Sequence, residues 1–147
     1  MALVLGLDAK AYRNASLDWS APNWALVSNL KDVTINLEAG DADVTTRAGG
    51  GFRQSVATLK DGSVDFQMGW DTADAQFTAI QTAFFANTAV EMALMDGLIA
   101  TTGSQGLHAD FSVTNFSRSE ALEEALMVDI SLKITKSDNT PEWLTVS

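Results

Sequence analysis

The chain has 147 residues, 46% of them hydrophobic and 19% charged, with no cysteine and a formal net charge of −10. This length fits one domain with one core, and the balance of apolar and charged residues excludes a disordered chain. The missing cysteines exclude disulfides and thiolate metal sites, and the negative charge disfavours nonspecific attraction to nucleic acid or to an anionic membrane.

Residues 1–30 are the first predicted segment, an N-terminal arm with weak periodicity and one short strand near residues 11–15. The segment has neither the basic start nor the cleavage site of a signal peptide. No apolar run in the chain approaches the ~18 residues that a transmembrane helix needs. We therefore expect no membrane association.

Residues 32–38 are the first clear strand, because Val33, Ile35 and Leu37 alternate with polar residues. Residues 39–52 contain four glycines and little apolar content, so they are predicted to form a long loop. A strand near residues 53–59 and a turn at Lys-Asp-Gly, the next three residues, then lead into SVDFQMGWD.

That stretch, residues 63–71, alternates throughout, with Val64, Phe66 and Met68 on one side and Asp65 and Gln67 on the other. This alternation is typical of a half-buried strand. The period then changes to that of a helix over residues 73–86, capped by the preceding Asp-Thr pair. In this helix Phe77, Ile80 and Phe84 share a face that can cover the apolar side of a sheet.

The second half of the chain adds three predicted strands, at residues 90–95, 107–116 and 126–136. In the second of these, His108 and Asp110 fall on the polar side. A polar turn or short helix precedes the last strand, and residues 137–147 form a C-terminal tail without periodicity.

Together these elements predict a single mainly β domain over residues 1–147, an antiparallel sandwich or barrel with one flanking α-helix. The polar strand faces are strongly acidic. The side chains that we expect on this polar surface are Asp32, Thr34, Glu38, Asp65, Gln67, Asp110, Asp129 and Ser131.

No catalytic or cofactor site is predicted. GDADVTT resembles the start of a calcium loop, but Thr46 and Phe52 replace the glycine and the glutamate that such a loop requires. The lone histidine, His108, is interpreted as a solvent-facing strand residue. Asp65 and Asp129 could pair as hydrolytic carboxylates, but an open strand face lacks the desolvation that separates their pKa values. We therefore expect no enzyme activity, no cofactor and no bound metal.

The ordered series DVTINL, ADVTTR, DFQMGWDTAD, FSVTNFSRSEALEEA and PEW resembles the major tail tube proteins of long noncontractile-tailed phages. The resemblance covers residues 29–84 and 108–146. It implies a β-sandwich with a flanking helix that assembles as six-membered rings, which stack into a hollow tube. The sheets of neighbouring subunits would then form one continuous barrel, with the polar surface facing the bore.

The same resemblance implies the partners and the location. The partners would be further copies of the chain, a tape measure protein, a tail terminator and distal tail proteins, with double-stranded DNA passing through unbound. The protein would be assembled in the host cytoplasm and reside in the virion tail. Asp41, Asp43, Arg47 and Gly50 of the long loop are candidate contacts between subunits.

Two other functions remain open at this point. A tube of the same ancestry, such as the type VI secretion tube, would carry effector proteins rather than DNA. A monomeric β-barrel that binds a small molecule would need an apolar interior cavity, whereas the predicted helix and strand faces are sufficient to fill the interior.

Overall fold

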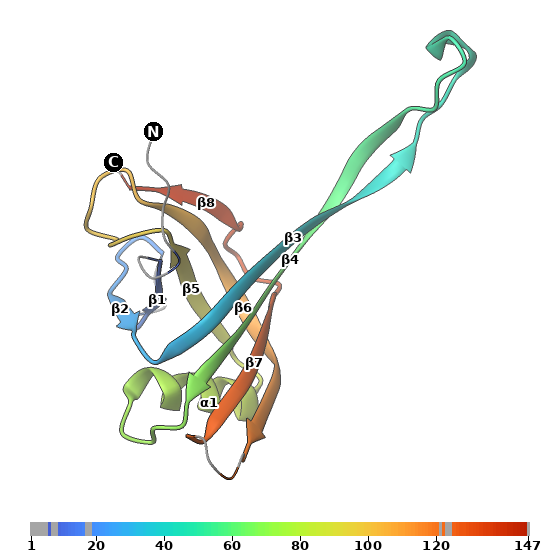
Figure 1. The fold of residues 1–147 in the computed structure, drawn as a ribbon. Coiled ribbons are helices and arrows are strands. Elements are labelled where there is room, and N and C mark those ends of the chain that lie inside the picture. The colour runs from blue at the N-terminus through green and yellow to red at the C-terminus, as the bar shows by residue number, and fades with distance from the viewer. Residues whose placement is uncertain (1–5, 7–8, 17–18, 121, 123–124, 147) are drawn as a thin grey trace.

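The computed structural model describes residues 6, 9–16, 19–120, 122 and 125–146, and most of them lie in antiparallel β-strands (Figure 1). The described elements are β1 (Lys10–Asn14), β2 (Trp24–Val27), β3 (Leu30–Asp43), the short 3-10 helix η2 (Arg47–Gly49), β4 (Ser55–Gly69), α1 (Ala75–Ala86), β5 (Ala89–Met95), β6 (Gln105–Ser119), β7 (Met127–Ile134) and β8 (Glu142–Thr145). The predicted fold class, mainly β with a flanking helix, is confirmed.

The strands form one curled sheet in the order β2-β1-β5-β6-β7-β4-β3, and every pairing is antiparallel. Strand β8 lies outside this path and pairs with the start of β6. Although β2 and β3 are consecutive in the chain, they lie at opposite ends of the sheet. Each therefore has one edge unpaired with any described strand.

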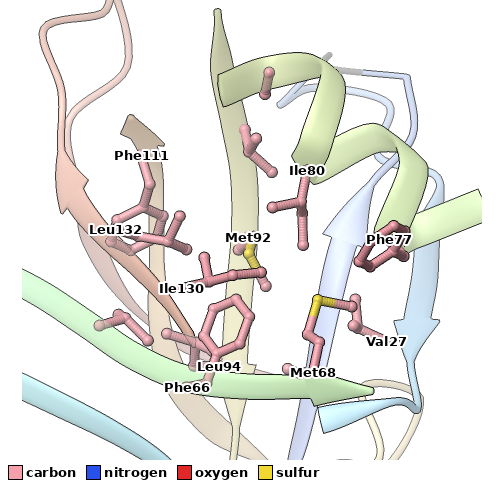
Figure 2. Close-up of a cluster of buried hydrophobic side chains, with 14 of the residues drawn as sticks. Val27, Phe66, Met68, Phe77, Ile80, Met92, Leu94, Phe111, Ile130 and Leu132 are labelled. Atoms are coloured by element: carbon pink, nitrogen blue, oxygen red, sulfur yellow. The ribbon is translucent and has the colours of Figure 1, made fainter. Parts of the chain in front are cut away.

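The main core lies between the sheet and α1 (Figure 2). Val64, Phe66 and Met68 of β4 are almost completely buried, as their alternation predicts, and they share one core cluster with Ile130 of the neighbouring β7 and Phe111 of β6. Burying a side chain of this size contributes about 1.5–3 kcal/mol to folding. The interior is thus occupied by the chain's own side chains.

Helix α1 covers this core. Its N-cap is Asp74, whose side chain accepts a hydrogen bond from the backbone N–H of Gln76, so the cap lies a few residues later than predicted. Phe77 and Ile80 are fully buried, as expected. Phe84 is only partly buried and stacks on Phe116 of β6, with ring centroids 5.8 Å apart.

A β-bulge in β6 keeps its apolar side chains in the core. Val113 pairs with Leu132 and Asn115 pairs with Ser131, so Thr114 is an extra residue without a partner in β7. The alternation therefore changes parity at Thr114, which a simple period of two cannot represent.

The first five residues of the predicted loop, residues 39–43, are the end of β3, and residues 44–52 lie in the loop that follows it. Strands β3 and β4 form a long hairpin that projects away from the rest of the molecule (Figure 1), and the connecting loop is residues 44–54.

The prediction of a turn at residues 60–62 is wrong, because β4 runs through these residues. Gly62 is buried there: a Cβ on it would lie 2.4 Å from Cδ1 of Ile134. The glycine thus permits close packing rather than a reversal of the chain.

The two terminal segments contain more strand than predicted. The short strand near residues 11–15 is confirmed as β1, but β2 was not predicted, because its four residues are too few to show alternation. The tail at residues 137–147 supplies β8. The predicted turn or short helix before the last strand begins inside β6 and otherwise lies partly outside the described residues.

Candidate functional site

Four adjacent strands, β6, β7, β4 and β3, present a continuous polar surface on the side of the sheet opposite the main core. We call this surface the polar face. The strand register arranges its side chains in rows across the sheet: Ser112-Lys133-Ser63-Asn36, Asn115-Ser131-Asp65-Thr34 and Ser117-Asp129-Gln67-Lys31, followed by Asp61-Glu38 on the hairpin. Residues paired across antiparallel strands point to the same side of a sheet.

Hydrogen bonds tie the rows of the polar face together. Asp65 lies near its centre and accepts a hydrogen bond from Ser131 Oγ on β7 at 2.6 Å and a longer one from Asn36 Nδ2 on β3 at 3.4 Å. Asp65 is therefore held in place from both neighbouring strands while remaining exposed to solvent. The central carboxylate of the polar face is consequently held in a defined position.

The charge of the polar face is negative. Four carboxylates, Glu38, Asp61, Asp65 and Asp129, and two ammonium groups, Lys31 and Lys133, give 2 − 4 = −2 per subunit. Glu38 and Asp61 lie directly opposite each other. Like charges in that arrangement destabilise a strand pair, so the acidic character opposes stability here.

Six of the eight predicted residues share the polar face: Thr34, Glu38, Asp65, Gln67, Asp129 and Ser131. Asp32 does not continue the alternation, because it lies in a β-bulge of β3 with a φ of 55°. The prediction that Asp110 lies on the exposed polar surface is wrong, because this residue is only 9% exposed. Lys31, Asp61, Asn115 and Ser117 were not predicted, because the bulges in β3 and β6 and the turns predicted at residues 60–62 and 117–125 hid their parity.

On the side of β5 and β6 that faces away from the main core, a buried polar network surrounds His108, which is 4% exposed and therefore not solvent-facing as predicted. Its Nε2 lies 2.8 Å from Glu91 Oε2, and its Nδ1 lies 2.9 Å from Glu142 Oε1. Trp19 stacks on the imidazole with ring centroids 3.8 Å apart, and Trp24 meets it edge-on.

The indole of Trp19 also contacts Asp110, which is buried. Trp19 Nε1 donates to Asp110 Oδ1 and Asn139 Nδ2 donates to Asp110 Oδ2, both at 3.2 Å. The network thus joins the N-terminal segment, the sheet and the C-terminal segment. No group of three or more His, Asp or Glu side chains within the described part of the chain is arranged to hold a metal ion.

The candidate loop contacts all lie on the projecting hairpin. Asp41 and Asp43 are exposed on the far end of β3, Arg47 begins η2, and Gly50 ends it with a φ of 67°. Hydrogen bonds from the side chain and the backbone of Thr45 lower the pKa of Asp43. The hairpin end is therefore charged and locally ordered.

No helix within the described ranges is long and apolar enough to cross a membrane.

Comparisons with known proteins identify what the chain is similar to. A family model described as phage tail tube protein matches residues 15–136. A comparison with curated proteins finds no match.

Solved structures share the fold. A chain in the virion of a native gene transfer agent particle has a TM-score of 0.72 at 14% identity, covering 97% of this chain and 100% of that chain. The SPP1 tail tube has a TM-score of 0.73 at 14% identity, covering 99% and 81%. The tail of an empty gene transfer agent particle, solved with C6 symmetry, has a TM-score of 0.71 at 16% identity, covering 99% and 100%.

Proposed function

The chain belongs to the phage tail tube protein family, and from this premise we propose that it forms six-membered rings that stack into a hollow virion tail tube. The polar face lines the bore, through which the genome passes from the capsid to the host. The observation that carries this proposal is the polar face itself, a fixed acidic wall across four strands with the core behind it. The C6 symmetry of the similar gene transfer agent tail supports the choice of six subunits.

The dimensions are consistent with passage of duplex DNA. Six subunits with four strands each give 24 strands, which at ~4.8 Å spacing and ~40° tilt form a barrel with a backbone diameter of about 45–50 Å. With six copies of a polar face of charge −2, the bore lining of each ring carries 6 × (−2) = −12. A wall about one Debye length, ~8 Å, from the DNA repels phosphate without binding it.

A structural role without catalysis follows from the same features. The carboxylates of the polar face are open to water and spread over several strands, which does not separate the pKa values of a catalytic pair. The interior is filled by side chains such as Phe66, Met68 and Phe111, which argues against a barrel that binds a small molecule. The tape measure, tail terminator and distal tail proteins are the further partners that this role requires.

A secretion tube is the second candidate. A chain in the baseplate of the anti-feeding prophage has a similar fold, with a TM-score of 0.64 at 10% identity over 99% of this chain and 98% of that chain. The match to the phage family model favours the tail tube over this alternative.

Electron microscopy of the purified protein tests the proposal. We expect rings or hollow tubes at high protein concentration. A variant lacking residues 41–50 is the control, because it should keep a native circular dichroism spectrum while losing tubes; shortening an exposed loop need not damage the core. A parent protein that stays monomeric at all concentrations would refute the proposal.

A further inference from the structure

Each ring nitrogen of His108 meets a carboxylate oxygen at hydrogen-bond distance. Nε2 lies 2.8 Å from Glu91 Oε2, and Nδ1 lies 2.9 Å from Glu142 Oε1. A hydrogen bond needs one proton between its two heavy atoms, and a neutral imidazole carries only one N–H. The cluster of these three side chains therefore needs one proton more than a neutral imidazole and two carboxylates supply.

The side chain of Asn14 fixes the role of Glu91 in this cluster. Asn14 Oδ1 accepts hydrogen bonds from the backbone N–H of Ser16 at 3.1 Å and from that of Asn23 at 2.9 Å. The amide nitrogen Nδ2 is thereby assigned as the atom that donates to Glu91 Oε2 at 2.9 Å. Because this oxygen is already an acceptor, its contact with His108 Nε2 is completed by a proton on the ring nitrogen.

The other ring nitrogen also takes its proton from the ring. The Glu142 side chain is 48% exposed, and a carboxyl group open to water is ionised at neutral pH. The proton between Nδ1 and Oε1 therefore belongs to Nδ1. Trp19 stacks on the ring with centroids 3.8 Å apart, and the face of an indole attracts a cation at this distance. Both contacts favour an imidazolium at His108.

The other strands packed around the ring add one further acidic and one basic group. Strand β6 places Asp110 two residues beyond His108, on the same side of the sheet. Strand β1 places the Tyr12 hydroxyl and the Lys10 ammonium on that side, and the described residues of β2 carry no charged side chain. Carboxylates thus outnumber the ammonium group around the ring, which stabilises a cation there.

The contact with Glu142 attaches the C-terminal strand to the sheet. Strand β8 has four residues, and Glu142 is paired directly with His108 of β6. If Nδ1 lost its proton, its lone pair would face the Glu142 carboxylate, and two acceptors at this distance repel each other. Because Glu142 is half exposed, its side chain can turn into water and weaken the pairing of β8 with β6.

We propose that the cluster is a proton latch, in which an imidazolium at His108 holds β8 on the sheet and releases it as the pH rises above neutral. The attached state binds one proton more than the released state. The equilibrium constant for attachment therefore falls with rising pH, by up to about tenfold per pH unit. The latch goes beyond the proposed function and does not depend on it, because all its contacts lie within one subunit.

Nuclear magnetic resonance of the full chain, kept below the concentration at which it assembles, tests the protonation state. His108 is the only histidine, so its two ring nitrogens give unambiguous ¹⁵N signals. At about pH 7, where a free imidazole is mostly neutral, we expect both nitrogens to carry a proton. In Glu142→Gln the new amide can donate to Nδ1, so only Nε2 should carry one. An unprotonated ring nitrogen in the parent would overturn the proposal.

Amide hydrogen exchange of β8 and of Val146, whose N–H donates to the Ser104 carbonyl at 2.9 Å, tests the release. Exchange is first order in hydroxide and in the opening of the strand, so rates in the parent should rise by up to about 100-fold per pH unit between about pH 7 and pH 9. In Glu142→Gln they should rise only about tenfold per pH unit, because no proton is then linked to opening.

Asp138→Asn is the matched control, because it removes one carboxylate from an exposed position in the same C-terminal segment. We expect it to keep the steep pH dependence of the parent. Equal slopes for the parent and Glu142→Gln would overturn the latch, and so would loss of the steep slope in Asp138→Asn, since net charge rather than the contact would then be responsible. None of these outcomes depends on whether the protein forms tubes, so failure of the latch and failure of the proposed function are distinguishable.

Discussion

The buried network around His108 makes a stability prediction that separates its two carboxylate partners, Glu91 and Glu142. Replacing His108 by Ala leaves Glu91 completely buried. Glu91 Oε2 then keeps the hydrogen bond from Asn14 Nδ2 at 2.9 Å, while Oε1 has no hydrogen-bond partner within the described residues. Removing the partner of a buried acidic side chain costs about 3–5 kcal/mol.

Replacing Glu142 by Ala should cost much less, although its carboxylate lies at nearly the same distance from the imidazole. The Glu142 side chain is 48% exposed, whereas that of Glu91 is 0% exposed. Water can take the place of the Glu142 carboxylate at His108 Nδ1, so we expect a loss of under about 1 kcal/mol.

Urea unfolding of dilute monomeric protein, followed by circular dichroism and by tryptophan fluorescence, measures both changes. With a slope of about 2 kcal/mol per molar urea, His108→Ala should lower the midpoint by roughly 2 M. A double variant, Glu91→Leu with His108→Leu, should recover most of the loss, because apolar replacement of a whole buried pair is often neutral.

Equal losses for His108→Ala and Glu142→Ala would refute this reasoning, because burial would then not determine the cost. A loss below about 1 kcal/mol for His108→Ala would show that the buried carboxylate finds another partner at little cost.

Four further variants test the core, the sheet and the polar face. Phe77→Ala should cost about 3–5 kcal/mol and Phe84→Ala distinctly less, because only Phe77 is fully buried; similar urea midpoints for the two would contradict this ranking. Gly106→Ala should prevent folding, since its Cβ would lie 1.9 Å from the Leu94 carbonyl oxygen; a soluble variant with a native spectrum would show that β5 and β6 can separate. Asp65→Lys with Asp129→Lys should leave tails intact but slow DNA ejection at low salt, because the added cations attract phosphate; unchanged ejection kinetics would place these residues outside the bore.

Much of the sheet could be predicted from the sequence, because a strand with one buried face must alternate. Val64 in β4 and Ile130 in β7 are buried as their positions predict. Alternation identifies an apolar face without identifying what covers it. Ile35 has the same pattern and is 39% exposed, because its own subunit supplies no cover.

The site residues that sequence could not place depend on contacts between distant segments. His108 and Asp110 are polar residues at regular strand positions, and Trp19, 89 and 91 residues earlier in the chain, contributes to their burial by stacking and hydrogen bonding. Gly62 follows an aspartate and therefore fits a turn. Its actual role is to let Ile134 approach, which a local pattern does not reveal.

The strand order also determines the stage of synthesis at which the subunit can complete its β-sheet. Strand β7 is the element that pairs with both β4 and β6, and it is among the last strands to be made. Until residues 127–134 leave the ribosome, β3–β4 is an isolated ribbon and the remaining strands form a separate, incomplete sheet. Pairings between such distant segments have a high contact order and form slowly. A nascent chain therefore lacks the joined four-strand surface, and incorporation into a growing polymer is deferred until translation is almost complete.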